Sequence, residues 1–455
     1  MHKLLPEPIG RILDKLLKGE GEKARTGRGA MAAFVIRIAS AGIAFLSQIV
    51  LARWLGAFEF GLFSYAWIWV TVLGTLCTLG FAVSVVRCLP EYSSRGEVAR
   101  MRGFLAFGRA ISFGAGTLIL IAGAGFLYFG SELIGRDYAL PLAVALICLP
   151  AFAVTDFQDG AGRSQGWMDL ALVPPYVLRP ILLLTFILFA GWIGDRRDAT
   201  TAMLCAAIAT WLVAGLQYLL QRRRFRPILG QGPREMHSRS WLWLSLSLLL
   251  LEALSLLVLN LDLILLNFFV PPDQLGIYFA ATRTISLVAF IHFAVTAVAM
   301  PRFSSLFAAG RQAEIGPLLH DMQKWCVVPS LGGAAVLLLL GKPLLWLFGP
   351  GFTAAYPVMF ILAIGYVIRA FGGPAQSLLM ATGHHNRATG ILMATVALSG
   401  ALNLGLIPWL GITGAAIATA CALSFEAIAS FLVARRLFPP RGQAEAGKSR
   451  GSTAS

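Results

Sequence analysis

The chain has 455 residues, of which 57% are hydrophobic and only 13% are charged, and its mean hydropathy is +0.75. This composition excludes a soluble globular protein and predicts several membrane-spanning segments. In a soluble chain, a formal net charge of +15 would point to a nucleic-acid partner. In a membrane protein, basic residues gather on the cytoplasmic side, so we expect no nucleic acid here.

Residues 1–30 form a basic segment that precedes the first apolar run. Its apolar residues recur at helical spacing beside Lys and Arg, which is typical of a short amphipathic helix on an anionic cytoplasmic membrane surface. These apolar residues are Ile9, Ile12, Leu13, Leu16 and Leu17. A solvated tail is the alternative. The apolar run that starts near Ala30 continues at full spanning length without a convincing cleavage site, so we expect no removable signal peptide.

The rest of the chain is dominated by apolar runs of spanning length. About 20 apolar residues at a rise of 1.5 Å per residue cross the hydrocarbon core of a bilayer. We therefore predict an all-α polytopic membrane protein with about twelve transmembrane helices. They are expected at residues 31–54, 60–88, 103–129, 138–156, 170–193, 200–221, 241–270, 276–300, 322–348, 353–374, 387–408 and 412–437.

A shift of the chain by 215 residues aligns short motifs of the two halves. Gly61-Leu62-Phe63 falls on Gly276-Ile277-Tyr278, and Arg87 falls on Arg302. An even number of helices per half makes such a repeat parallel, with substrate sites at the interface between the halves. We predict two pseudo-symmetric halves around a central cavity. The expected parts are an N-terminal six-helix bundle (31–221), a cytoplasmic basic linker (222–240), a C-terminal six-helix bundle (241–437) and a disordered cytoplasmic tail (438–455).

The distribution of basic residues predicts the orientation in the membrane. Most of the 37 Lys and Arg residues lie in the N-terminal segment, in alternate loops and near the C-terminus. The intervening loops carry few: Arg53, Arg136, Arg196, Arg197 and Lys342. By the positive-inside rule, both termini of this multi-pass protein are expected in the cytoplasm.

Five arginines fall inside expected spans: Arg37, Arg109, Arg179, Arg283 and Arg369. An ionisable residue in a span costs about 2.5–3.5 kcal/mol on insertion scales, so each is a functional hypothesis. The alternative is that the side chain extends to the headgroups. We favour that alternative for Arg109 and leave it open for Arg179. For Arg37, which follows a full apolar turn, and for Arg283, which lies among small residues, we favour function.

Acidic and amide residues in the spans complete the set of candidates. The shift that aligns the halves places Arg37 on Glu252, so we hypothesise that these two residues face each other across the cavity and pair when it is empty. Protonation of Glu252 would then free Arg37 for an anionic ligand, whereas a fixed structural ion pair is the alternative. Asp262, Asn260 and Asn403 provide oxygen atoms for a weakly indicated cation site.

Metal and cofactor chemistry is not indicated by the sequence. The six cysteines lie in or beside apolar runs, and no pair has metal-ligand or CxxC spacing. His384 and His385 are adjacent but lack a third ligand. We expect no metal site and no cofactor other than a possible coupling ion, H⁺ or Na⁺.

Four motifs carry a resemblance to a known family. They are LARWLGAFEFGLFSYA (51–66), GIYFAATRT (276–284), LLMATGHHNRA (378–388) and LIPWLGITGAAIATA (406–420). Together they resemble polysaccharide flippases of the Wzx type, in the multidrug/oligosaccharidyl-lipid/polysaccharide exporter superfamily. The resemblance covers roughly residues 30–437.

The resemblance implies a transporter of the bacterial inner membrane and not an enzyme. Its substrate would be an undecaprenyl-pyrophosphate-linked oligosaccharide, moved from the cytoplasmic to the periplasmic leaflet for synthesis of O-antigen, capsule or exopolysaccharide. Possible partners, besides membrane lipid, are a polysaccharide polymerase and chain-length proteins. The related lipid II flippases have a cationic cavity with Arg on the first, second and eighth helices. Arg37 and Arg283 match by helix, whereas the second helix has Arg only at its inner end, Arg87.

The site residues expected from these arguments fall into three groups. Pyrophosphate would be bound by Arg37, Arg283, Arg179 and Arg369. Gating or ion coupling would involve Glu252, Asp262 and Asn403, and the cytoplasmic mouth would be marked by Arg87 and Arg302. Guanidinium groups suit pyrophosphate because they bind its oxygens in pairs.

Two other functions remain open at this stage. A cation-coupled multidrug exporter of the same superfamily would pair intramembrane carboxylates with cationic drugs, whereas this chain has more Arg than acid in its expected spans. A membrane glycosyltransferase or ligase should carry a sizeable extramembrane domain or a long catalytic loop, and the expected loops are short.

Overall fold

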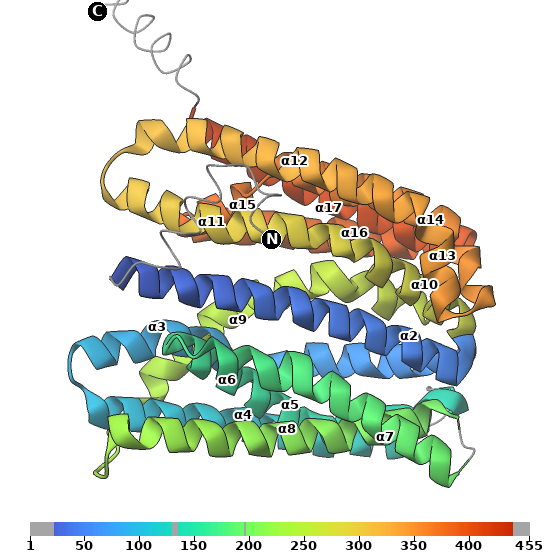
Figure 1. Ribbon diagram of the computed structural model, residues 1–455, viewed down its shortest axis with the longest axis horizontal. Coiled ribbons are helices and arrows are strands. Elements are labelled where there is room, and N and C mark those ends of the chain that lie inside the picture. The colour runs from blue at the N-terminus through green and yellow to red at the C-terminus, as the bar shows by residue number, and fades with distance from the viewer. Residues whose placement is uncertain (1–21, 130–134, 195–196, 440–455) are drawn as a thin grey trace, which may run out of the picture. The chain divides into compact units, whose positions relative to one another are not determined.

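The computed structural model describes residues 22–129, 135–194 and 197–439, and every regular element in these ranges is a helix (Figure 1). The side chains of residues 22–35, 37 and 38 are outside this description. The expected amphipathic helix around Ile9–Leu17 and the tail from residue 440 onward also lie outside it.

The helices follow one another with short connections. They are α2 (Glu22–Leu76), α3 (Phe81–Ser94), α4 (Val98–Phe129), α5 (Arg136–Ser164), α6 (Met168–Val173), α7 (Arg179–Ile193), α8 (Ala199–Leu229), α9 (Ser238–Leu266), α10 (Pro272–Ile285), α11 (Ala289–Ala308), α12 (Ile315–Leu339), α13 (Gly341–Phe348), α14 (Tyr356–Gly372), α15 (Ala375–Ala381), α16 (His385–Leu410) and α17 (Ile412–Leu437). A π-helical turn, Pro174–Leu178, joins α6 to α7, and short 3₁₀ turns cover Ser286–Val288, Gln312–Glu314 and Pro350–Ala355.

Eleven segments within the described ranges are long and apolar enough to cross a membrane. The first of them, Ala39–Ser94, covers most of the first expected span, 31–54, and all of the second, 60–88. The expected number of twelve is therefore recovered only when this segment is counted as two crossings. The prediction of an all-α multi-pass membrane protein is confirmed.

Gly56 divides the first of these segments, because α2 turns back on itself there (Figure 1). Its backbone has φ 77° and ψ 173°, a combination that is essentially restricted to glycine. A Cβ atom added at Gly56 would meet nothing within 4 Å. Glycine is therefore required here by the backbone conformation and not by close packing.

The described chain divides into two compact units. The first comprises Trp69–Arg196 and Thr200–Leu249 with the residues before Gln48, and the second comprises Gln48–Ile68, Arg197–Ala199 and the chain from Leu250 onward. The expected linker 222–240 is shorter in the structure, because α8 continues to Leu229 and α9 begins at Ser238. The boundary between the units falls within α9, at Leu249.

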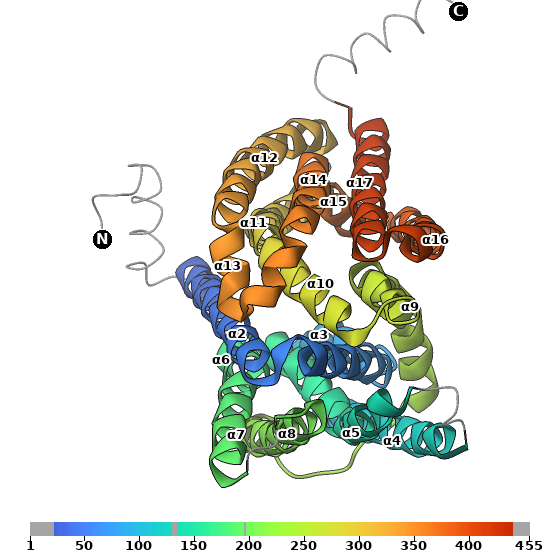
Figure 2. The same ribbon diagram turned by 90° about the vertical axis from the view of Figure 1, so that its right-hand side faces the viewer.

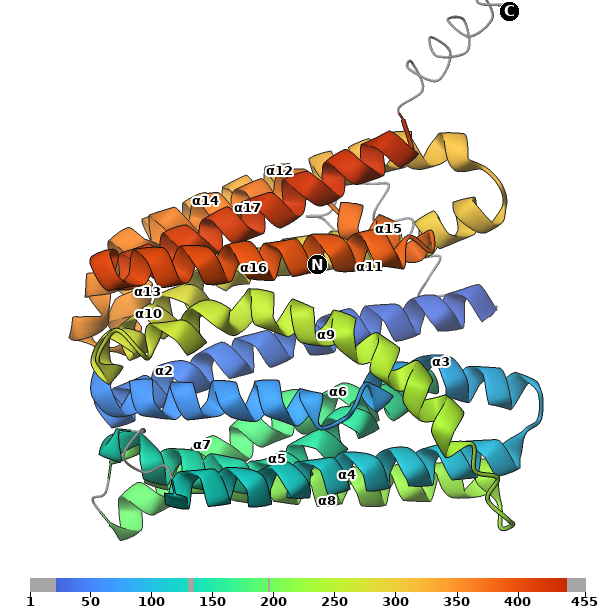
Figure 3. The ribbon, with the colours of Figure 1, turned by 180° about the vertical axis from the view of Figure 1, so that it is seen from behind.

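The first unit is built around an aromatic core. Phe81 packs against Phe104 with a centroid separation of 5.5 Å, and Phe104 lies 5.1 Å from the Trp241 ring. Phe157 of α5 and Phe225 of α8 belong to the same buried cluster. Aromatic rings bury a large apolar area each, so this cluster joins α3, α4, α5, α8 and the start of α9 (Figure 3).

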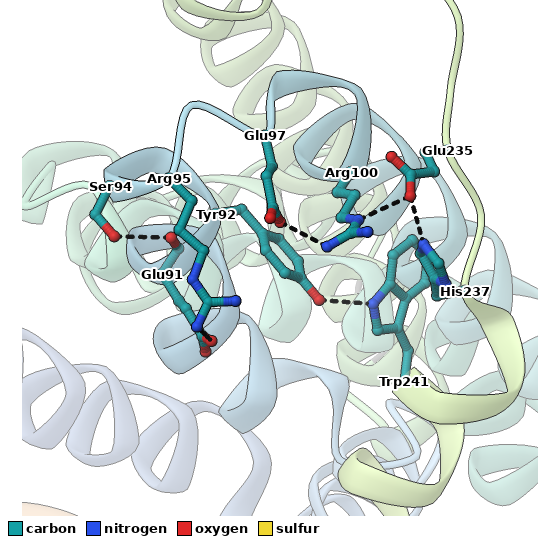
Figure 4. A network of polar contacts seen from close by, with 9 residues as sticks. All are labelled: Glu91, Tyr92, Ser94, Arg95, Glu97, Arg100, Glu235, His237 and Trp241. Carbon is teal, nitrogen blue, oxygen red and sulfur yellow. Dashed lines mark hydrogen bonds and ion pairs between the residues drawn. The ribbon is translucent and has the colours of Figure 1, made fainter.

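Polar contacts fasten the segment between α8 and α9 to α3 and α4 (Figure 4). Arg100 donates to Glu97 and to Glu235, and Trp241 Nε1 donates to the Tyr92 hydroxyl over 2.8 Å. His237 Nε2 lies 2.6 Å from Glu235 Oε1, and His237 together with Arg100 lowers the pKa of the Glu235 carboxyl. The charge of Arg100 is thus neutralised locally.

In the second unit, α17 packs against both α14 and α16 (Figures 2 and 3). Small residues bring α14 and α17 together: a Cβ atom on Gly365 would lie 2.7 Å from Ala420 Cα, and one on Gly372 would lie 2.8 Å from Ala427 Cβ. Such stripes of small residues are how helices pack closely in lipid, where no hydrophobic force drives them together.

The motif at residues 51–66 is a structural clamp within the second unit. Arg53 donates to the backbone oxygens of Leu347 (2.7 Å) and Trp346 (2.9 Å), and its guanidinium lies 4.7 Å from the Trp346 ring centroid. Phe60 packs edge-on against Phe279 at 5.8 Å. These contacts attach the turn at Gly56 to α13 and α10.

Gly61 and Gly276, the two glycines aligned by the 215-residue shift, contact each other. A Cβ atom on Gly276 would lie 3.0 Å from Gly61 N and 2.5 Å from Ala57 O. A Cβ atom on Gly61 would lie 1.8 Å from Pro272 O. Neither glycine can therefore be replaced without moving a backbone segment.

We expect Gly56→Ala to lower the midpoint of thermal unfolding, because alanine in this conformation carries roughly 1–3 kcal/mol of backbone strain. Gly42→Ala is the matched control. Gly42 lies in the same helix without a positive φ, and a Cβ atom there also meets nothing within 4 Å. The control should unfold at the parental temperature or slightly above it. Equal unfolding midpoints for the two variants would contradict the requirement for glycine at residue 56.

Candidate functional site

A buried carboxylate at Asp262 is the centre of the polar network in the second unit. Asp262 lies on α9 with 5% of its surface exposed. Its Oδ2 accepts hydrogen bonds from the Tyr278 hydroxyl (2.7 Å) and from the Thr419 hydroxyl (2.9 Å). Its Oδ1 accepts from the Leu263 amide at 2.8 Å. Three donors therefore compensate the loss of water around this carboxylate.

The chain connection explains why Asp262 and Tyr278 meet. Helix α9 ends at Leu266 and α10 begins at Pro272, so the two residues lie at similar distances from one short turn. Proline is favourable at a helix start because its missing N–H would have no helical partner there. Thr419 comes from α17, and the network thus joins α9, α10 and α17.

Arg283 lies further along α10, at an exposed position. Its guanidinium lies 4.6 Å from the Phe279 ring centroid, a cation–π distance. It is within electrostatic reach of the Asp262 carboxylate and of the Tyr366 hydroxyl. Within the described ranges it forms no ion pair. Arg283 therefore presents an accessible positive charge within electrostatic reach of a buried negative one.

Arg369 has a close acidic partner. Its Nη2 lies 3.7 Å from Glu426 Oε2, and the two side chains are 22% and 5% exposed. His292, Arg369 and Glu426 help to line a cavity of about 10 Å³, which is at the limit for one water molecule. Since the site is this small, the pair favours a structural role for Arg369 and leaves little room for a ligand.

Arg179 begins α7, directly after the π-helical turn. Its guanidinium lies 5.3 Å from the Phe152 ring centroid and within electrostatic reach of Tyr176 and Asp156. Because it belongs to the first unit, whereas Asp262 and Arg283 belong to the second, its expected role in pyrophosphate binding stays a prediction.

Within the described ranges, the structure shows no contact that brings the other expected site residues together into one site. The side chain of Arg37 lies outside the described part of the chain, so its pairing with Glu252 stays a prediction; Glu252 itself is half-buried on α9. Asn403 is buried, and its amide donates to Ser399 O (2.8 Å). Arg87 and Arg302 are exposed, on α3 and α11.

Four residues of this unit were not expected from the sequence: Tyr278, Thr419, Tyr366 and Glu426. Glu426 could have been found, because it is an ionisable residue inside a span, the same criterion that selected Arg369. Tyr278 and Thr419 lie inside motifs 276–284 and 406–420, but their partner depends on how three helices pack.

No metal centre is formed by the described residues: none of their His, Cys, Asp and Glu side chains gather in groups of three or more that could hold an ion. A carboxylate with two hydroxyl groups nearby, as at Asp262, is instead an arrangement that suits a proton or a single hard monovalent cation.

Solved structures with this fold are membrane transporters. A MOP superfamily transporter from Pyrococcus furiosus aligns with a TM-score of 0.68 and 16% identity, over 93% of this chain and 97% of that one. The lipid II flippase MurJ, in an inward closed conformation, aligns with a TM-score of 0.70 and 12% identity, over 89% and 87%. The inward-facing form of a multidrug-resistance MATE family transporter aligns with a TM-score of 0.69 and 15% identity, over 89% of this chain and 98% of that one. At these identities the likeness defines the fold alone.

The family follows from the sequence match. Residues 26–307 match the family model described as Polysaccharide biosynthesis protein, and the chain belongs to this family. The resemblance that the four motifs indicated is thereby confirmed at the level of the family and of the superfamily fold.

Two curated relatives come from Haloferax volcanii. The protein named Probable low-salt glycan biosynthesis flippase Agl15 is 22% identical over 409 residues, 88% of this chain and 82% of that protein. Probable flippase AglR is 28% identical over 171 residues, 37% of this chain. The match to AglR spans 36% of that protein's length.

We expect Tyr278→Phe to destabilise the chain, because it removes one of the two hydroxyl donors to a buried carboxylate. The loss of a hydrogen bond to a charged group costs about 1.5–3 kcal/mol. Thermal unfolding of the purified protein measures this as a lower midpoint. Tyr128→Phe serves as the control, since Tyr128 is 79% exposed and forms no hydrogen bond to the described residues. An unchanged midpoint for Tyr278→Phe would show that Asp262 does not depend on it.

Proposed function

We propose that this chain is a flippase that moves a lipid-linked glycan across the membrane. The family and the names of two relatives support this class of function. The observation that carries the proposal is Arg283, an accessible guanidinium inside a span, within electrostatic reach of a buried carboxylate. Such a charge is costly in lipid unless a ligand or partner uses it.

The substrate we propose is a glycan on undecaprenyl pyrophosphate, made for O-antigen, capsule or exopolysaccharide. A guanidinium binds two phosphate oxygens at once and replaces part of their hydration shell. Arg283 would act together with Arg37, and with Arg179 where the cavity reaches it. The pairing of Arg369 with Glu426 makes Arg369 the weakest of the four candidates.

Alternating access is the mechanism we propose for the two six-helix halves. In parallel-repeat transporters the halves rock about a site at their interface. The contact between Gly61 and Gly276 supports the repeat, since residues that lie beside a pseudo-two-fold axis meet their own equivalents. The lipid tail would stay in the bilayer while the pyrophosphate crosses through the cavity.

Asp262 is the residue we propose for ion coupling. While Asp262 is charged, it attracts Arg283 and competes with an anionic ligand. Binding of a proton or of Na⁺ at Asp262, with help from Tyr278 and Thr419, would cancel this attraction and favour the ligand. Glu252 would have the same effect on Arg37, and Asn403 would complete the set of oxygen donors.

The membrane potential would assist outward transport. Moving one charge across 100 mV is worth about 2.3 kcal/mol. A dianionic pyrophosphate leaving an inside-negative compartment would therefore gain roughly twice this amount, if no protein charge moves with it. In the orientation that the basic residues predict, both termini would lie in the cytoplasm, and Arg87 and Arg302 would mark the cytoplasmic mouth. A bacterial inner membrane is the location we propose.

A multidrug exporter is the second candidate, because a MATE family transporter shares the fold. The carboxylates of Asp262 and Glu426 would then be the groups that meet a cationic drug. The relatives described above are flippases and transporters, which disfavours the glycosyltransferase or ligase alternative. A polysaccharide polymerase and chain-length proteins are the protein partners that a flippase of this kind would serve.

We expect Arg283→Ala to reduce flipping of a fluorescent undecaprenyl-pyrophosphate oligosaccharide in proteoliposomes by at least about tenfold. The estimate follows from the loss of charge-assisted hydrogen bonds worth about 1.5–3 kcal/mol. The flipping rate of Arg283→Lys should fall between those of the parent and Arg283→Ala, because lysine keeps the charge but lacks the paired donors of a guanidinium. Arg37→Ala should also fail.

Arg311→Ala is the matched control for this experiment, because Arg311 is exposed and already paired with Glu314. It should flip lipid at the parental rate. If Arg283→Ala also flips at that rate, Arg283 is not a substrate ligand. If the parent fails with several glycans but exports cationic dyes, the multidrug exporter replaces the flippase.

A further inference from the structure

A strongly basic pocket lies within the first unit, apart from the residues discussed above. It has a volume of about 780 Å³ and is lined by α4, α8 and the segment after α8. Six guanidinium groups line it: Arg102, Arg109, Arg222, Arg223, Arg226 and Arg234. Among the residues that the structure describes, no carboxylate side chain lines this pocket. So many like charges around one space repel each other unless an anion lies between them.

Neighbouring arginines outside the pocket are neutralised by acidic residues. Arg100 bonds to Glu97 and Glu235 (Figure 4). Arg224, in the same run as Arg222 and Arg223, pairs with Asp169 at 2.9 Å and lies 4.9 Å from the Trp167 ring centroid. By contrast, the six pocket arginines form no ion pair with any residue in the described ranges. Acidic residues thus neutralise Arg100 on α4 and Arg224 on α8, whereas the described residues provide no counter-charge for the pocket arginines.

Arg109 shows an unused binding capacity in this pocket. Its guanidinium lies 5.3 Å from the Tyr218 ring centroid. Its Nε and Nη2 atoms are buried and have no hydrogen-bond partner within the described part of the chain. Buried donors of a charged group are costly to leave unsatisfied, and phosphate oxygens are the ligands that match them. The sequence predicted that the Arg109 side chain extends to the lipid headgroups. Its unsatisfied donors suggest a specific ligand there, the phosphate group of a headgroup in this pocket.

Arg102 builds the wall of the pocket. Its guanidinium donates to Leu229 O and, over 3.0 Å, to Pro233 O. A Cβ atom on Gly232 would lie 2.8 Å from Arg102 Nη2, so glycine leaves room for this contact. The segment after α8 is thereby held against α4, and the pocket is a preformed feature of the first unit.

The face of α8 that leads to the pocket is apolar. Leu212, Leu216 and Leu219 are 51%, 42% and 53% exposed, and their spacing places them on one side of the helix. Arg222, Arg223 and Arg226 follow three, four and seven residues after Leu219, on the same side. An acyl chain lying along the leucines would bring its headgroup to the arginines. This continuity favours a membrane lipid over a soluble phosphate.

We propose that this pocket binds the phosphate groups of an anionic membrane lipid. Basic pockets between transmembrane helices recognise phosphate headgroups in this way. The lipid chemistry could come from a two-phosphate phospholipid such as cardiolipin or from a polyprenyl pyrophosphate, and both present the same phosphate oxygens. The proposal does not depend on the transport function proposed above.

Native mass spectrometry of the purified full chain tests this directly. The probes are cardiolipin, polyprenyl pyrophosphate, phosphatidylethanolamine and inorganic pyrophosphate, each added to delipidated protein. The parent should retain cardiolipin or polyprenyl pyrophosphate at least tenfold better than phosphatidylethanolamine. The better of the two identifies the source of the headgroup.

The double variant Arg222→Ala/Arg226→Ala should lose this retention by at least tenfold, whereas Arg224→Ala should keep it. Arg224→Ala removes the same charge from the same helix turn, but on the side paired with Asp169. Equal retention by the double variant and the parent would overturn the proposal. So would binding of inorganic pyrophosphate alone, without preference for either lipid.

Cross-linking of the parent with a photoreactive form of whichever of the two lipids it retains better gives a result that does not depend on how the variants fold. Labelled peptides should come from residues 212–234 and from the beginning of α4. Labels confined to other helices would contradict the site.

Discussion

The cost of placing a charge in hydrocarbon is the constraint on which the arrangement of this protein depends. Each ionisable side chain in a span must find a partner, reach water or serve a ligand. Arg369 forms an ion pair with Glu426, and Arg53 donates hydrogen bonds to two backbone oxygens of α13. Asp262 is satisfied by three donors. Arg283 is different, because it stays accessible within electrostatic reach of that satisfied carboxylate.

Under the coupling proposed for Asp262, this difference would give the second unit two electrostatic states. Charged Asp262 would attract Arg283, and neutralised Asp262 would leave the guanidinium free for an anion. Tyr366 lies within electrostatic reach of Arg283, Arg369 and Asp262. In the proposed mechanism, this network would let an ion influence the binding of an anionic lipid.

In the first unit, many charged side chains lie near helix ends. Arg100 and Arg224 are neutralised by acidic neighbours, whereas the basic pocket concentrates unneutralised guanidinium groups beside an apolar face. The positive-inside rule treats these residues only as markers of orientation. The structure shows which of these arginines are paired with acidic residues and which line the basic pocket. A count of charges in each loop cannot show this difference.

The sequence predicted the helical spans well, because the length of an apolar run is set by the thickness of the bilayer. The helix that holds the sixth expected span extends beyond it: the apolar run stops near 221, but helix α8 continues through its arginines to Leu229. Arginine is a good helix former, so the change of polarity did not end the helix. Gly230, with a positive φ, follows its last residue.

The candidate site was predictable in part. The criterion of an ionisable residue in a span selected Arg283, Arg369 and Asp262, each of which the structure places in one unit. It could not select Tyr278 or Thr419 as partners of Asp262, because a hydroxyl group is ordinary in a membrane helix and its partner is decided by how α9, α10 and α17 pack. It also could not separate the paired Arg369 from the accessible Arg283, since that difference depends on a residue 57 positions further along the chain, Glu426.

The central claim is that the charge of Asp262 controls the availability of Arg283, and the most direct test is the affinity for polyprenyl pyrophosphate. It should be measured across pH and Na⁺ concentration for the parent and for Asp262→Asn. We expect the parent to bind more tightly as acid or Na⁺ neutralises Asp262, and Asp262→Asn to bind tightly throughout, without dependence on either ion. A variant whose affinity and ion dependence both match those of the parent would contradict it.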